Sequence, residues 1–369
     1  MIPASAPNDK NTLLREAIRA RLLTGRYAGR VPGERELARE FGVNVKTANK
    51  AVSALVAEGV LQRRRGEGTF VSARAASRLR RGTRTVSYLA HCTREALLAG
   101  GYYLEIFRGV EEVFGGNKVQ LELVTNEARG RRPGPPVEEV VREGTRGTIA
   151  VGIMEEDYLA KLAEGGTRLV LVDYWSPVQL LDSVTVESVA ASYQAVRWLL
   201  EEGRSRVAFL GGLRGSALRT DPDSFDRLKG YRMALGESGL DYEEGLVHFA
   251  RADGPGGAAF VEECWNGTGA EGLPDAVLCF TDTQARGAAR ALEEKGISVP
   301  GEVTVVGFGG RYLVREEPRT WIEVAVDARA LGRVAAERML TLLNGDAPGG
   351  EPMHLTVPGR FSVTGESGR

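Results

Sequence analysis

Cysteine, histidine and long apolar runs are all scarce in this sequence of 369 residues. The three cysteines are far apart and odd in number, which favours free thiols in a reducing compartment over a disulfide framework. The three histidines are isolated, without zinc-type spacing, so we expect neither a metal nor a cofactor. No apolar run approaches the roughly 18 residues of a membrane span, and the first residues, MIPASAPNDKNTLL, show no secretory pattern. We therefore expect a cytoplasmic protein with no membrane partner.

Acidic residues are scarce in the N-terminal part of the chain. Residues 1–85 contain 18 Lys and Arg but only 7 Asp and Glu, a net charge of +11, although the whole chain has a formal net charge of -1. The remaining residues therefore carry 30 basic and 42 acidic side chains, a net charge of -12. Such asymmetry predicts a cationic module that meets a polyanion, joined to an acidic module that does not.

The basic part of the chain has helical periodicity. Apolar residues recur every three or four positions from Leu13 to Leu23 and again in ERELAREF, residues 34–41. Gly42 can end this second helix, and Asn44 can cap a third, which has one apolar stripe. The other faces of the third helix carry amides, hydroxyls and lysines and almost no acid. This pattern is typical of a helix-turn-helix, whose polar edge pairs with bases and phosphates in the major groove.

A strand, a turn and a second strand follow in GVLQRRRGEGTFVS. The glycines let the backbone turn sharply, and the three arginines before them are suited to a phosphate strand, as in the wing of a winged helix. The whole stretch PGERELAREFGVNVKTANKAVSALVAEGVLQRRRGEGTFV resembles the GntR-type winged helix. The resemblance implies DNA contacts from Arg35, Asn44, Lys46, Thr47 and Gly66. From their positions we add Asn49, Lys50, Arg64 and Arg65.

Val45 and Asn49 stand where many members of that family have arginines, so we expect an altered base preference. Residues 1–72 are thus predicted to form a winged helix-turn-helix DNA-binding domain, and the small, basic residues 73–84 a linker. A winged helix used only for protein contacts is the alternative.

From Thr85 onward, near-continuous apolar strands alternate with amphipathic helices. This alternation indicates α/β architecture, with parallel sheets covered by helices on both faces. Residues 85–369 are too many for one core and predict two doubly wound lobes, with a ligand between them beyond the carboxyl ends of their strands.

Motifs of catalysis are missing from this larger part. VVGFGGRY lacks the third glycine of a dinucleotide loop, no serine lies in a G-x-S-x-G elbow, and no Walker loop occurs. We therefore expect a binding protein and not an enzyme. Two other classes stay open: a solute-binding module with a basic appendage, and an enzyme-like domain fused to a DNA-binding head.

Several stretches of the larger part resemble, in order and spacing, the LacI/GalR effector-binding fold, which is related to periplasmic sugar-binding proteins. They include SVTVESVAASYQAVRWLLEEGRSRVAFLGG, DRLKGYRMALGESG and PDAVLCFTDTQARGAARALEEKG. A GntR-type head on a LacI-type body occurs in regulators similar to the arabinose-responsive repressor of bacilli. The resemblance implies a homodimeric repressor on a pseudo-palindromic operator in double-stranded DNA. Its DNA affinity would be controlled by a small-molecule effector, a sugar or a sugar acid.

The same resemblance places Asp173, Arg227, Thr281 and Asp282 at or beside the effector. Arg227 offers a fork of donors for vicinal hydroxyls or a carboxylate, and Asp173 can accept hydroxyl hydrogens. Asp282 is equally suited to cap the helix that follows it. Gly309 stands where the family places an aspartate, which gives weight to an anionic effector.

Three further residues complete the expected effector site. Tyr102 and Trp175 lie on loops after strands, where aromatic rings either stack on a sugar face or pack the lobes. Glu187 begins the helix after a crossover strand, where the family commonly has aspartate.

Overall fold

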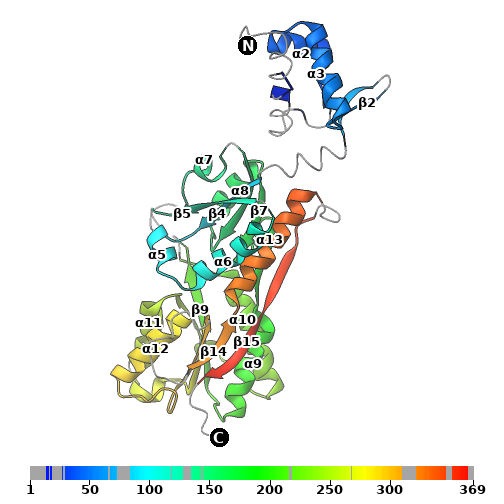
Figure 1. Ribbon diagram of the computed structural model, residues 1–369. Coiled ribbons are helices and arrows are strands. Elements are labelled where there is room, and N and C mark those ends of the chain that lie inside the picture. Colours follow the sequence, from blue (N-terminus) through cyan, green and yellow to red (C-terminus); the bar gives the residue numbers. More distant parts are fainter. Residues whose placement is uncertain are drawn as a thin grey trace. The chain divides into compact units, whose positions relative to one another are not determined.

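The chain divides into two compact units in the computed structural model (Figure 1). The first unit is Met1–Thr85 with the short segments Lys118–Gln120 and Leu343–Asp346, and the second contains the rest. We call them the N-terminal and C-terminal units. The structure describes residues 14, 15, 17, 18, 27, 30–64, 67–72, 84–117, 119–127, 134–142, 144–215, 218–266, 268–309, 321–345 and 351–364.

The N-terminal unit is a winged helix-turn-helix, as predicted. Its elements are β1 (Arg30–Val31), α2 (Glu34–Phe41), α3 (Val45–Ala57), β2 (Leu61–Arg64) and β3 (Gly68–Val71), with an antiparallel sheet in the order β1-β3-β2. Gly42 ends α2 with a left-handed φ of 66°, which a glycine adopts at little cost. The core of the unit includes Leu14, Ile18, Leu37, Leu55 and Leu61.

The C-terminal unit has the predicted two-lobed α/β architecture. Lobe 1 contains β4 (Arg84–Ala90), α5 (Arg94–Leu98), α6 (Tyr102–Gly115), β5 (Val119–Thr125), α7 (Val137–Val140), β6 (Thr145–Val151), α8 (Glu156–Glu164), β7 (Arg168–Val172), β8 (Asp182–Glu187) and α13 (Ala328–Asn344). Lobe 2 contains α9 (Ser188–Glu201), β9 (Val207–Arg214), β10 (Arg219–Thr220), α10 (Pro222–Glu237), β11 (Val247–Arg251), α11 (Gly254–Trp265), β12 (Ala276–Cys279), α12 (Asp282–Glu294), β13 (Thr304–Gly309) and β14 (Trp321–Val326). Short 3₁₀ helices at Glu244–Leu246 and Gly269–Gly272 also belong to lobe 2.

One long strand, β15 (His354–Thr364), joins the sheets of the two lobes. Its first residues pair with β8 in parallel, and its last residues pair with β14 antiparallel. The resulting strand order is β10-β9-β12-β13-β14-β15-β8-β7-β6-β4-β5, with β11 beside β9. Most neighbouring strands within each lobe are parallel. Since apolar residues line both faces of these strands, each sheet needs helices on both sides.

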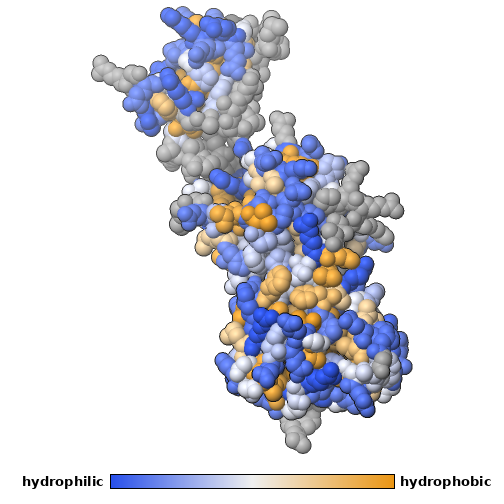
Figure 2. Space-filling view, turned by 180° about the vertical axis from the view of Figure 1, so that it is seen from behind, coloured by the Kyte–Doolittle hydropathy of each residue, from blue (hydrophilic) through white to orange (hydrophobic). Residues whose placement is uncertain are grey.

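Helices cover the sheet of lobe 2 on both faces, with α9 and α10 on one side and α11 and α12 on the other (Figure 1). Three connections pass between the lobes: β8 into α9, β14 into α13, and the middle of β15. Figure 2 shows a mostly hydrophilic surface on the visible face of the N-terminal unit, whereas hydrophobic side chains gather around the middle of the C-terminal unit.

Candidate DNA-contact surface and effector site

Helix α3 keeps its apolar stripe buried and leaves its polar edge in solvent. Ala48, Ala51, Val52 and Leu55 are at most 1% exposed. Asn44 caps the helix, because its Oδ1 accepts the backbone N–H of Thr47 at 2.7 Å. Among the residues predicted to contact DNA, Arg35, Asn44, Lys46, Asn49 and Lys50 are exposed, and Thr47 is half-buried. Arg35 lies at the start of α2, and the others lie at the N-cap and in the first two turns of α3.

The arginines of the wing point to different partners. Arg64 is exposed, lies over the ring of Phe70 with 4.7 Å between Cζ and the ring centroid, and is 3.7 Å from Glu67. Its neighbour Arg63 instead donates to Glu34 and to Ser53, each at 3.1 Å. Because successive side chains of a strand alternate between its faces, Arg63 ties the wing to α2 and α3.

The predicted wing residues Arg65 and Gly66 lie outside the described residues, as do residues 73–83 of the predicted linker. The tie made by Arg63 was not anticipated from the sequence. The one feature of the sequence that points to this contact is that Arg63 and Arg64, as neighbours in a strand, must lie on opposite faces.

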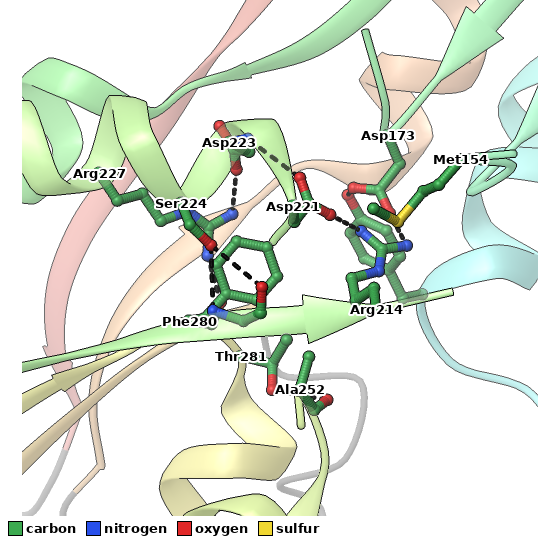
Figure 3. A network of polar contacts seen from close by, with 12 residues as sticks. Met154, Asp173, Arg214, Asp221, Asp223, Ser224, Arg227, Ala252, Phe280 and Thr281 are labelled. Carbon is green, nitrogen blue, oxygen red and sulfur yellow. Dashed lines mark hydrogen bonds and ion pairs between the residues drawn. The ribbon is translucent and has the colours of Figure 1, made fainter. Parts of the chain in front are cut away.

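Where the lobes meet, a guanidinium from lobe 2 binds residues of lobe 1. Arg214, the last residue of β9, donates through Nη2 to Asp173 Oδ2 at 3.1 Å and to the hydroxyl of Tyr103 at 3.0 Å. Its Nη1 donates to Asp221 of lobe 2 at 2.7 Å (Figure 3). Tyr102 donates its own hydroxyl to Asp173 Oδ1 at 2.9 Å. The side chain of Arg214 is only 18% exposed, so these contacts replace most of its hydration.

The backbone of lobe 1 is shaped to receive this guanidinium. Gly152, directly after β6, has a φ of 68°, and a Cβ there would lie 3.3 Å from Arg214 Nη2 and 3.0 Å from the hydroxyl of Tyr103. Asp173 follows β7 with a φ of 59°, a left-handed conformation that is uncommon outside glycine. An uncommon conformation held by a polar network is typical of a binding site. We call Tyr102, Tyr103, Gly152 and Asp173 the lobe 1 socket.

Burial shifts the protonation equilibria around Arg214. The pKa of Asp221 is raised to about 6 by burial, although the neighbouring guanidinium acts in the opposite direction. Burial likewise raises the pKa of Tyr103 to about 12, so its hydroxyl stays protonated and available as a donor. Asp221 also caps α10, since its side chain accepts the backbone N–H of Asp223 at 3.0 Å. The sequence signals this cap by the proline that follows it.

Arg227 is held within lobe 2. It donates to Asp223 and to the backbone carbonyl of Phe280, and its guanidinium lies between the rings of Phe280 and Phe308 at 4.2 and 3.9 Å (Figure 3). The side chain is 7% exposed, and its Nε is buried without a hydrogen-bond partner among the described residues. An anion would therefore compete with Asp223 for this fork, which weakens the expectation of an anionic effector.

The remaining predicted residues of lobe 2 sit at the start of helices. Thr281 caps α12, because its side chain accepts the N–H of Gln284 at 3.0 Å. Capping was one of two roles open to Asp282, and Thr281 provides the cap instead, while the Asp282 carboxylate accepts the N–H of Thr283 at 2.7 Å. A Cβ at Gly309 would lie 2.7 Å from Asp282 Cγ, so the Asp282 carboxylate fills the space beside that glycine.

Glu187 and Trp175 are both half-buried, and each makes contacts within the fold. Glu187 is the N-cap of α9 and accepts the N–H of Ala190 at 3.1 Å. Trp175 packs edge-on against His354, with ring centroids 6.1 Å apart, and its indole N–H is buried without an acceptor in the described part of the chain. Tyr102 is a polar partner of Asp173 and packs edge-on against Tyr103. These contacts give no support to stacking of the Trp175 or Tyr102 ring on a sugar.

No group of three or more His, Cys, Asp or Glu side chains with metal-binding geometry occurs among the residues that the structure describes. None of the described helices is long and apolar enough to cross a membrane. The polar side chains described at the site are carboxylates, tyrosine hydroxyls and the guanidinium groups of Arg214 and Arg227.

Two family descriptions match the chain. Residues 12–71 match "Bacterial regulatory proteins, gntR family", and residues 196–367 match "Periplasmic binding protein-like domain". These matches agree with the winged helix of the N-terminal unit and with the two-lobed fold of the C-terminal unit.

Curated relatives and solved structures point the same way. The HTH-type transcriptional regulator GalR of Salmonella typhimurium is 28% identical over 223 residues, which cover 60% of this chain and 63% of GalR. The HTH-type transcriptional regulator RegA of Clostridium saccharobutylicum is 23% identical over 321 residues, 84% of this chain and 92% of RegA. The solved complex of the transcriptional regulator CelR with cellobiose shares the fold, with a TM-score of 0.65 and 22% identity over 90% of this chain and 99% of CelR. The chain therefore combines a DNA-binding domain of the GntR family of bacterial regulatory proteins with a periplasmic binding protein-like domain related to those of LacI/GalR-type regulators.

Proposed function

We propose that the protein is a ligand-responsive transcriptional repressor. One observation carries this proposal: a helix-turn-helix with an exposed edge of Asn and Lys side chains shares a chain with a two-lobed domain whose lobes meet at a polar network. The net charge of +11 on residues 1–85 supports duplex DNA as the partner of the first domain. The names of the relatives support regulation, and we propose no enzymatic activity.

The effector that the site supports best is a sugar or another polyhydroxylated molecule. Asp173, Asp221 and Asp223 supply carboxylate oxygens that accept hydroxyl hydrogens, and Arg214 supplies donors. The bound cellobiose of the related CelR supports the same class. Because Arg214 and Arg227 already pair with these carboxylates, a neutral sugar fits the site better than a sugar acid.

Effector control would act through the closure of the two lobes. Arg214 of lobe 2 in the lobe 1 socket is a contact that exists only while the lobes are close together. A ligand that binds one arrangement of the lobes more tightly shifts the population toward it. A coupling of about 1–3 kcal/mol, or roughly 5- to 150-fold in DNA affinity, is typical of such pairs of sites.

A homodimer would place two winged helices on one pseudo-palindromic operator, since one small head covers too little DNA for specificity. The centres of its half-sites would be about 34–36 Å apart, or a multiple of that distance.

The test begins with selection of bound sequences from a random duplex library by the full-length protein. The proposal predicts an enriched inverted repeat. In parallel, a thermal-shift screen of neutral sugars and sugar acids should give a stabilising compound from the neutral set. Absence of any enriched sequence would contradict DNA recognition. Absorbance near 420 nm from the purified protein would indicate a cofactor bound as a Schiff base and would support the enzyme-like alternative.

A further inference from the structure

One apolar side chain interrupts the polar edge of α3. Val45, the first residue of the helix, is 48% exposed, whereas the other large apolar side chains described in the N-terminal unit are buried or half-buried. Its exposed neighbours Asn44 and Lys46 are polar. Val45 contributes to neither the core of the unit nor the cap of the helix, which Asn44 provides.

Helix geometry places Val45 beside a residue that can read a base. Residues four apart lie on the same helix face, so Val45 and Asn49 are neighbours on the exposed edge. Ser53 donates its hydroxyl to Asn49 Oδ1 at 3.5 Å. The same hydroxyl accepts a hydrogen bond from Arg63 at 3.1 Å. The base edge that suits an asparagine is adenine, through N6 and N7.

We propose that Val45 determines operator specificity by contacting the 5-methyl group of a thymine in the major groove. This inference rests on the proposed function. A valine can neither donate nor accept a hydrogen bond, and the thymine methyl is the apolar group that a base edge presents in the major groove. A polar base edge pressed against Val45 would lose its hydration without a new partner. The half-site therefore contains a thymine opposite Val45, within reach of the adenine that suits Asn49.

Replacement of single thymines by uracil in a selected operator tests this contact, because uracil keeps the base pair and removes only the methyl group. The full-length protein should bind about fourfold more weakly per half-site when the contacted thymine is replaced, the effect expected for one buried methyl group. Val45→Ala should bind the thymine and uracil duplexes with nearly equal affinity. The control Lys46→Ala should bind both more weakly and keep the difference between them.

Two results would overturn the assignment. Either every uracil duplex binds the wild-type protein as tightly as the parent duplex, or Val45→Ala retains the preference for thymine. Since Val45 is half exposed, its replacement leaves the core of the unit intact, and an unchanged melting temperature verifies this. Failure to enrich any sequence from the library would instead overturn the proposed function and this inference with it.

Discussion

Arg214 at the end of β9 and Asp173 directly after β7 form an ion pair between the two lobes, with 3.1 Å between Nη2 and Oδ2. The pair is about four-fifths buried on both sides, and Tyr102 and Tyr103 complete its hydrogen bonds. Breaking it requires either separated lobes or a new partner for each charge, since an unpaired buried charge is costly. Under the proposed function, this pair links effector binding to the arrangement of the lobes.

Loss of this guanidinium should separate the lobes. We expect Arg214→Gln to lengthen the mean distance between spin labels at Lys161 of lobe 1 and Lys229 of lobe 2, both exposed positions. Electron double resonance on the full-length protein measures that distance, with the native cysteines replaced. Arg219→Gln is the matched control, because Arg219 lies opposite Arg214 in the strand pair but is exposed. Equal distance distributions in both variants would show that Arg214 does not hold the lobes.

Arg227→Ala should destabilise lobe 2 and abolish the effector response. The substitution leaves Asp223 and the carbonyl of Phe280 without their donor and removes the cation between two rings, at a cost of about 2 kcal/mol or more. Urea unfolding measures the loss, and Arg232→Ala on the exposed side of the same helix should cost less. Operator affinity without effector should stay at the wild-type value. A variant still released by the same effector concentration would remove Arg227 from the site.

Asp221 should make stability depend on pH. Its pKa is about 6 in the folded protein because of burial, and about 3.9 is usual for an unfolded chain. The folded state therefore keeps a proton that the unfolded state releases in this window. The contribution of Asp221 to the free energy of unfolding is fully present below about pH 4 and is lost as the pH rises through 6, an effect on the order of 3 kcal/mol. In Asp221→Asn, which keeps a capping oxygen, this change should vanish. If the difference in the free energy of unfolding between the wild type and Asp221→Asn were constant from pH 4 to 7, the raised pKa of Asp221 would be contradicted.

Lys46→Ala combined with Asn49→Ala should relax sequence preference more than it weakens nonspecific binding. Both side chains are exposed on α3, and base contacts typically contribute about 1–3 kcal/mol of discrimination each. Mobility-shift titrations on the selected operator and on a scrambled duplex give the two affinities. Arg39→Ala, an exposed basic position at the far end of α2, is the control. Equal losses on both duplexes would argue against base reading by this edge.

The helix ends of the winged helix could be predicted from the sequence, because each depends on residues close to it in the chain. Gly42 and the cap by Asn44 lie within a few residues of the elements they terminate. The alternation of apolar strands and amphipathic helices likewise predicted the two-lobed fold, confirmed by the strand order and by the matched families.

The polar network between the lobes could not be read in the same way. Arg214 meets Asp173 and Tyr103 from positions 41 and 111 residues away, and no local pattern encodes such pairs. Likewise, Arg227 was expected to offer free donors, but two aromatic rings and Asp223 from other turns and strands surround it. Thr281 and Asp282 are both residue types favoured at the N-cap of a helix. The backbone geometry shows that Thr281 is the N-cap of α12.

The most direct test of the account is a fluorescence-anisotropy titration of the selected operator with the full-length protein, with and without the sugar that stabilises it most. We predict that the sugar changes operator affinity at least about fivefold. The affinity for a scrambled duplex should not change, and Asp173→Asn should not respond. Equal operator affinity with and without a sugar that calorimetry shows to be bound would contradict the coupling between the two units.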